Sequence, residues 1–223
     1  MEIKSTADIV LRGVTLLVYG QSGVGKTTLI RTIPGRKLIL SAEGGLLSLQ
    51  GTDIQYVDIH TMDELTEAFT HVVNHISDYD CVILDSLSEL AEVILSAEKK
   101  STKDPRQAYL AMQDQIMDLV RAFRDLPVTV YMTAKVEKSR DDITGRIMFA
   151  PSIPGQKSTQ NLPYQFDEVL AMRSETNESN ENVRFIQTFS DSSWCCKDRS
   201  GKLDPYEEAD LGKILTKIGG ERK

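Results

Sequence analysis

A glycine-rich stretch followed by lysine and threonine holds the residue types and spacing that could do chemistry. It consists of Gly20, Gln21, Ser22, Gly23, Val24, Gly25, Lys26, Thr27 and Thr28. The spacing matches the P-loop pattern in full, in which backbone N–H groups turn inward around phosphate oxygens. The lysine of this pattern reaches the β- and γ-phosphates, and the hydroxyl after it binds Mg²⁺. The stretch therefore predicts a site for ATP and Mg²⁺.

The elements expected on either side of the glycine-rich stretch fit this interpretation. An apolar run from Val14 to Tyr19 predicts a buried strand, and a helical stretch is expected to start near Lys26. A strand before the loop and a helix after it are the context that the motif requires. The alternative is a glycine-rich turn between strand and helix with a lysine present by chance.

A second apolar run ends in an acidic residue. Cys81 to Leu84 predict a short buried strand, and Asp85 follows at its carboxyl end. An aspartate in this place beside a P-loop can hold Mg²⁺ through water. Asp85 could instead cap the helix that the sequence DSLSELAEVIL predicts. Both roles place it at the strand tip, and the need of the P-loop for a Mg²⁺ partner favours the metal role.

A third predicted strand, within residues 36–46, ends in Ser41, Ala42 and Glu43, with two glycines after them. Ligands of open α/β sheets bind at the carboxyl ends of the strands. Glu43 is therefore the candidate general base that polarises an attacking water. A solvated turn residue is the alternative role for Glu43. Glu89 is a second candidate base, but it falls inside the helix predicted after Asp85.

The rest of the sequence alternates strand patterns with helical ones. A β-branched run at 126–135 follows a segment with helical apolar spacing, whose first turn suits Pro105. Alternation after a P-loop predicts an α/β fold with a mainly parallel, twisted sheet and helices on both faces. NVRFIQTFSD and SWCCKD are expected to add late antiparallel strands, and residues 205–223 a closing helix and tail. We expect residues 1–223 to form one domain.

With these elements the chain resembles the RecA-like ATPase core. It looks more closely like the small phage-type P-loop ATPases that include the Sak group of single-strand annealing proteins. The resemblance covers most of the chain and rests on GQSGVGKTT, LILSAEGG, VILDSLSEL and VYMTAK. It implies that the VYMTAK strand senses the γ-phosphate. RecA-like proteins often end this strand in a polar amide, whereas this chain offers Thr133 and Lys135.

The resemblance also implies what the protein does and with which partners. It implies an Mg²⁺-dependent ATPase that acts on single-stranded DNA in recombination or replication. It further implies a homo-oligomer with nucleotide at the subunit interfaces, and a single-strand binding protein is a candidate partner. Motor, annealing and strand-exchange roles are not separable from the sequence.

In RecA-like proteins the segment after the sensor strand contacts single-stranded DNA, which makes residues 135–160 a candidate DNA-binding hairpin or mobile loop. DDITGR marks its turn. Its candidate DNA-binding residues are Lys138, Arg140, Arg146 and Lys157. Together with Phe149 they could neutralise phosphates and stack a base. Acidic residues cancel much of this charge, so a solvated charged hairpin is the alternative.

A late pair of basic residues, Lys197 and Arg199, gains a second candidate role from the resemblance. RecA-like assemblies use a lysine and a second basic residue two positions on to reach the γ-phosphate of a neighbouring subunit. Positions i and i+2 of a strand share a face, so these two side chains point together. The alternative is an exposed turn, because KDRSGKLDP is rich in turn residues.

Composition limits the remaining function classes. The chain has 223 residues, three cysteines and a net charge of −7. It has no run of about 18 apolar residues, so no membrane-spanning helix is expected. Its N-terminus lacks the build of a signal peptide, and its cysteines lack zinc-type spacing. These features favour a reducing cytoplasm, that of the host if the protein is phage-encoded.

Two other function classes remain beside the DNA-dependent ATPase. The acidic balance argues mildly against a dedicated nucleic-acid binder. It favours an ATP-switched regulatory or loader module that acts on a protein partner without DNA. A small-molecule kinase is the third class, but the sequence shows no arginine-rich lid and no evident acceptor pocket.

Overall fold

The computed structural model describes residues 13–142, 144–155 and 161–219. The strands are β1 (Thr15–Gly20), β2 (Lys37–Ser41), β3 (Gln55–Asp58), β4 (Cys81–Asp85), β5 (Thr129–Arg140), β6 (Ile147–Ser152), β7 (Glu168–Thr176), β8 (Asn182–Gln187), β9 (Lys197–Asp198) and β10 (Tyr206–Glu208). The α-helices are α1 (Met62–Asn74), α2 (Leu87–Ser101), α3 (Pro105–Arg124) and α5 (Leu211–Ile218). Short 3₁₀ helices are η2 (Thr28–Thr32), η3 (Leu46–Leu49), η4 (Ile76–Asp78) and η5 (Leu162–Gln165). No helix in this part of the chain is long and apolar enough to cross a membrane.

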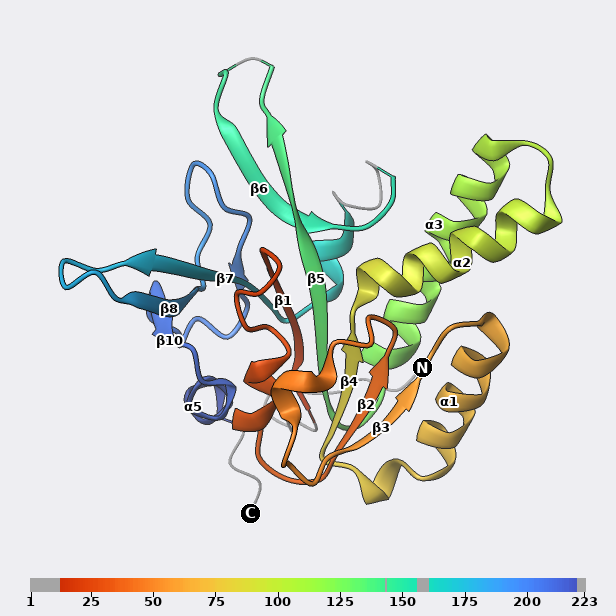
Figure 1. The fold of residues 1–223 in the computed structure, drawn as a ribbon, viewed down its shortest axis with the longest axis horizontal. Coiled ribbons are helices and arrows are strands. Elements are labelled where there is room, and N and C mark those ends of the chain that lie inside the picture. Colours follow the sequence, from red (N-terminus) through yellow and green to blue (C-terminus); the bar gives the residue numbers. More distant parts are fainter. Residues whose placement is uncertain (1–12, 143, 156–160, 220–223) are drawn as a thin grey trace, which may run out of the picture.

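All described strands belong to one sheet, in the order β10-β8-β7-β1-β5-β4-β2-β3, with β6 beside β5 and β9 beside β7 (Figure 1). The pairs from β7 to β3 along this order are parallel. β6, β8, β9 and β10 pair in the antiparallel sense. This arrangement confirms the expected fold class. It also places β5 between β1 and β4, so the carboxyl ends of β1, β5, β4 and β2 share one edge.

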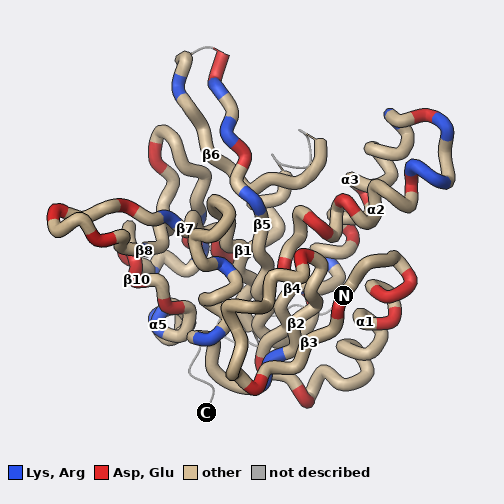
Figure 2. Tube along the Cα trace, viewed as in Figure 1, with Lys and Arg blue, Asp and Glu red and all other residues tan. Residues whose placement is uncertain are grey.

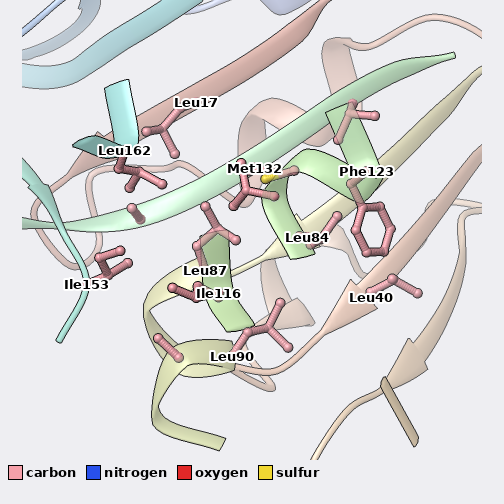
Figure 3. Close-up of a cluster of buried hydrophobic side chains, with 14 of the residues drawn as sticks. Leu17, Leu40, Leu84, Leu87, Leu90, Ile116, Phe123, Met132, Ile153 and Leu162 are labelled. Carbon is pink, nitrogen blue, oxygen red and sulfur yellow. The ribbon is translucent and has the colours of Figure 1, made fainter. Parts of the chain in front are cut away.

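Two apolar cores cover the two faces of the sheet. The larger core packs α1, α2 and α3 against one face, and Figure 3 shows Leu84, Met132 and Phe123 among its side chains. The second core lies on the other face, where η2, η3 and α5 cover it. Helices therefore cover both faces, but among the described residues the second face has only 3₁₀ turns and the short α5.

Local signals in the sequence mark the ends of the helices. Thr61 begins α1 in a reciprocal capping box with Glu64, and Asp104 caps α3, with Pro105 in its first turn. Gly219 ends α5 with a left-handed φ of 107°. Caps of this kind satisfy N–H and C=O groups that have no partner inside the helix.

The helix expected from Lys26 onward is instead η2, a 3₁₀ helix that begins at Thr28. The segment TTLIRTI is rich in β-branched residues, and Pro34 follows it directly, which disfavours a long α-helix. The hydroxyl of Thr32 also donates to the carbonyl of Leu29 (2.7 Å). The chain thus leaves the P-loop through one tight turn.

The strand expected over SWCCKD is also shorter than predicted. Only Lys197–Asp198 form a strand, and Trp194 makes a single bridge with Phe149. The residues before Lys197 form a turn instead, because the carboxylate of Asp191 accepts hydrogen bonds from the N–H groups of Ser193 and Trp194 (2.6 Å each). Local side-chain bonds have replaced a sheet ladder here.

Glu168, at the start of β7, is a buried acid with a side chain only 1% exposed. Burial, together with the nearby carboxylates of Asp198 and Asp167, raises its pKa to about 8. The folded chain therefore holds a proton that the unfolded chain has released at intermediate pH. Stability from this group is complete below the ordinary glutamate pKa and is lost as pH rises through the raised one.

We expect Glu168→Gln to reduce this loss, because the amide keeps the shape of the protonated acid and carries no titratable proton. Between about pH 5 and pH 9, the variant should gain about 1–3 kcal/mol of unfolding free energy relative to the natural chain. Urea unfolding at both pH values measures the difference. Glu67→Gln, at an exposed position of α1, is the control. Equal pH dependence in natural chain and Glu168 variant would contradict the assignment.

Candidate nucleotide site at the carboxyl edge of the sheet

The P-loop forms a cradle that only glycine could complete. Gly23 and Gly25 have φ values of 75° and 111°, which side-chain-bearing residues rarely adopt. A Cβ atom on Gly20 would lie 2.5 Å from the carbonyl oxygen of Met172. The ammonium of Lys26 donates to the carbonyls of Gly20 and Gln21 (3.0 Å each) and thus spans the loop. The loop geometry fits the phosphate cradle predicted from the motif.

Strand β5 fixes the base of this cradle. The fully buried Tyr131 donates a hydrogen bond from its hydroxyl to the carbonyl oxygen of Lys26 (2.9 Å). Register pairs Leu16 with Tyr131 and Gly20 with Lys135, so β5 runs beside β1 to the start of the loop. A bond from a rigid strand to the loop backbone limits the positions that the loop can take.

Asp85 collects the hydroxyl groups around the predicted metal position. Its side chain is 1% exposed. Thr27 donates to its Oδ2 (2.7 Å), and Thr133 donates to its Oδ1. The hydroxyl of Ser41, opposite Asp85 in the pairing of β2 with β4, is buried without a partner in the described chain. Carboxylate and hydroxyl oxygens are ligands that suit Mg²⁺, so Thr27 and Asp85 fit the role of holding it.

The carboxylates of the two candidate bases differ in their hydrogen-bond and ion-pair partners. Glu43 is exposed, and its backbone N–H donates to the carbonyl of Asp85 (3.2 Å). Its carboxylate has no hydrogen bond or ion pair with any described residue. Glu89, in the first turn of α2, is paired with the ammonium of Lys135. The Glu43 carboxylate can thus accept a hydrogen bond from a water, whereas that of Glu89 is already neutralised.

Charged groups gather on the β5, β4 and β2 side of the P-loop. Burial lowers the pKa of Lys26, against the opposing effect of Glu43 and Asp85. The hydrogen bond to Glu89 raises the pKa of Lys135. Of the two candidate γ-phosphate sensors, Thr133 is buried and bonded to Asp85, whereas Lys135 is exposed in the middle of β5, opposite Gly20.

The structure places Lys197 and Arg199 away from their own P-loop. β9 pairs with the first residues of β7, which lie beside the amino half of β1. Arg199 forms an ion pair with Asp167 (2.7 Å), and the ammonium of Lys197 donates to the carbonyl of Phe166 (2.6 Å). The two side chains contact the same segment, but β9 ends at Asp198, and they do not join the site within this chain.

The candidate DNA-binding residues lie on a hairpin of β5 and β6 that projects beyond the sheet (Figure 1). Lys138, Arg140 and Arg146 are exposed there, and Lys157 falls outside the described residues. Basic and acidic positions are mixed along the hairpin (Figure 2). Phe149 stacks on Trp194 with ring centroids 4.4 Å apart, so this aromatic ring is already engaged within the chain.

Sequence reasoning missed Arg184, on β8. A Cβ atom placed on Gly25 would lie 3.1 Å from Nη1 of Arg184 and 3.1 Å from Cε of Met172. No motif in NVRFIQ marks this arginine. Its place depends on the pairing of β8 with β7 and of β7 with β1, which local pattern does not reveal.

Comparisons with known proteins find a family model and solved structures that are similar to this chain. A family model described as an AAA domain matches residues 12–200. Among solved structures, a KaiC-like protein from the hyperthermophilic archaeon Pyrococcus horikoshii OT3 is 15% identical, with a TM-score of 0.43. That match covers 78% of this chain and 77% of the other. A comparison with curated proteins finds no match.

We expect Tyr131→Phe to weaken nucleotide binding, because it removes the hydrogen bond that fixes the Lys26 carbonyl. A neutral hydrogen bond contributes about 1 kcal/mol, so affinity for ADP should fall roughly fivefold. Titration calorimetry with ADP measures it. Tyr79→Phe is a matched control, since it removes a hydroxyl bonded to His71 (2.9 Å) outside the site. Unchanged ADP affinity in the Tyr131 variant would show that the bond does not hold the loop.

Proposed function

Since the chain belongs to the AAA domain family of P-loop ATPases, we propose that it hydrolyses ATP with Mg²⁺ to act on single-stranded DNA. This activity would serve DNA recombination or replication of the phage type. One observation carries the proposal: β5 is a single strand that runs from the nucleotide site to the basic hairpin. Tyr131, Thr133 and Lys135 stand at its site end, and Lys138 and Arg140 at its far end.

The roles in hydrolysis follow from the contacts in the site. Lys26 binds the β- and γ-phosphates, and the backbone N–H groups of the P-loop surround the phosphate oxygens. Thr27 and Asp85 hold Mg²⁺, which neutralises charge on the phosphates when bound. Glu43 accepts the proton of the attacking water, since its carboxylate has no other partner in the described chain. Lys135, which lies opposite Gly20 in the pairing of β5 with β1, is the γ-phosphate sensor.

We expect Glu43→Gln to retain ATP binding and to lower turnover by roughly 10²–10⁴-fold, the usual contribution of a general base. Steady-state hydrolysis with Mg²⁺ and ATP titration measure the two quantities separately. Glu89→Gln is the control, because it alters a nearby carboxylate whose partner is Lys135. Full turnover in the Glu43 variant, with loss in the Glu89 variant, would assign the base to Glu89.

The charge of the hairpin supports the DNA part of the proposal. Lys138, Arg140 and Arg146 form no ion pair with an acid in the described chain, which leaves three cations for phosphates. Lys138 and Arg140, two positions apart on β5, point to one face. Several such hairpins in an assembly would combine into one basic surface. The net charge of a single chain is then a poor guide to DNA binding.

We expect single-stranded DNA to stimulate ATP hydrolysis, more steeply as protein concentration rises. Replacing Lys138, Arg140 and Arg146 together with alanine should abolish the stimulation, because phosphate contacts dominate such binding. Basal turnover without DNA should remain. A matched triple variant on α3, with Arg106, Arg121 and Arg124 replaced by alanine, controls for the loss of charge. A hairpin variant that is still fully stimulated would contradict the assignment.

Oligomerisation belongs to the same proposal. Lys197 and Arg199 lie too far from their own P-loop to act there, so they act across a subunit interface on the γ-phosphate of a neighbour. Their present partners, Asp167 and the carbonyl of Phe166, would have to be exchanged for that phosphate. The resemblance to the Sak group supports this arrangement and a single-strand binding protein as a further partner.

The net charge of −7 favours a second candidate function. An ATP-switched regulatory or loader module would bind a protein partner without DNA and turn ATP over slowly. Hydrolysis that is indifferent to single-stranded DNA at every protein concentration would support this module in place of the DNA-dependent ATPase.

A further inference from the structure

Arg184 lies against the P-loop of its own chain. The closest approach is to Gly25, where a Cβ atom would meet Nη1 at 3.1 Å and Cζ at 3.5 Å. Any side chain larger than glycine at this position would therefore press on the guanidinium. Arg184 reaches the loop from β8. Ile186, also on β8, and its partner Met172 on β7 belong to the core beneath the P-loop.

The guanidinium of Arg184 makes no hydrogen bond or ion pair with any described residue, and the side chain is exposed. Arg173 on β7, which pairs with Phe185 and points to the opposite face of the sheet, shows the contrast. It bonds Gln187 (2.6 Å) and Glu175 (2.7 Å) and lies over the rings of Phe185 and Trp194. Arg173 is thus fully engaged in the fold. Arg184 presents its five donors beside a loop that binds anions.

Strand order decides which phosphates Arg184 would meet. β7 and β8 flank β1 on one side, and β5, β4 and β2 flank it on the other. Asp85, Glu43 and Lys135 all lie on the second side, where the metal and γ-phosphate belong. The P-loop backbone cradles the α- and β-phosphates between them. Arg184 approaches that cradle from the side opposite the metal.

We infer that Arg184 is a phosphate-binding residue that contacts the diphosphate of the nucleotide held by the P-loop of its own chain. The inference rests on the nucleotide site of the proposed function, and it adds a ligand from β8 that the P-loop motif does not contain. A planar guanidinium binds phosphate oxygens through paired hydrogen bonds. Such a contact exists with both ADP and ATP.

The kinetic consequence differs from that of a residue acting on the γ-phosphate. A contact made equally in the ground state and the transition state lowers KM and leaves kcat unchanged. Loss of Arg184 should therefore weaken ADP and ATP binding by the same factor. Loss of a finger that acts across a subunit interface would instead lower kcat and leave ADP affinity intact.

The experiment compares Arg184→Ala, Arg184→Lys and the natural chain by calorimetric titration with ADP and with ATP, and by steady-state hydrolysis. We expect roughly tenfold weaker binding of both nucleotides for the alanine variant, an intermediate loss for lysine and an equal kcat. Arg121→Ala is the control. Its guanidinium lies on α3 and pairs only with Asp118 (2.8 Å), so the control should bind as the natural chain does.

The outcomes separate this inference from the proposed function. A natural chain that binds neither ADP nor ATP overturns the nucleotide site itself. Equal ADP affinity in the natural chain and the Arg184→Ala variant overturns the inference alone. Loss of kcat with unchanged ADP affinity also overturns it, because Arg184 would then act on the γ-phosphate. Circular dichroism and thermal unfolding of both variants show whether any loss reflects misfolding.

Discussion

The hydrogen bonds that converge on Asp85 are the constraint on which the nucleotide site depends. Its carboxylate accepts from Thr27 of the P-loop and from Thr133 of β5. Its carbonyl accepts from the backbone of Ala42 and Glu43, beyond β2. A buried carboxylate is stable only when such donors surround it. The carboxyl ends of β1, β2 and β4 must therefore lie at the level of Thr133 in β5, and this requirement fixes the sheet and the site together.

The sequence predicted the central part of this arrangement because the signals there are local. Apolar runs that end in Gly20, Asp85 and the residues before Glu43 mark parallel strands by composition alone. Parallel strands bring their carboxyl ends to the same edge. The chemistry of three distant segments thus followed from one rule about sheets.

Features that depend on competition or on distant pairing could not be predicted in the same way. The strand expected over SWCCKD gave way to a turn, because Asp191 offers closer acceptors to the same N–H groups. The helix expected after the P-loop is only the short η2, because the residues there are largely β-branched. Arg184 reaches Gly25 only because β8 lies beside β7 and β7 beside β1. No residue near Arg184 in sequence carries that information.

The side chains around the phosphate site come from strands on both sides of β1. On the β5, β4 and β2 side stand the oxygens for Mg²⁺, the carboxylate of Glu43 and the cation of Lys135. On the β7 and β8 side, Arg184 is the cation against the loop. Every one of these groups comes from the chain that holds the P-loop, whereas Lys197 and Arg199 lie beside the amino end of β7, at the opposite edge of the sheet. In the proposed assembly, nucleotide affinity is then a property of one subunit. Dependence on assembly should enter only through turnover, where charge develops that the groups of one chain do not meet.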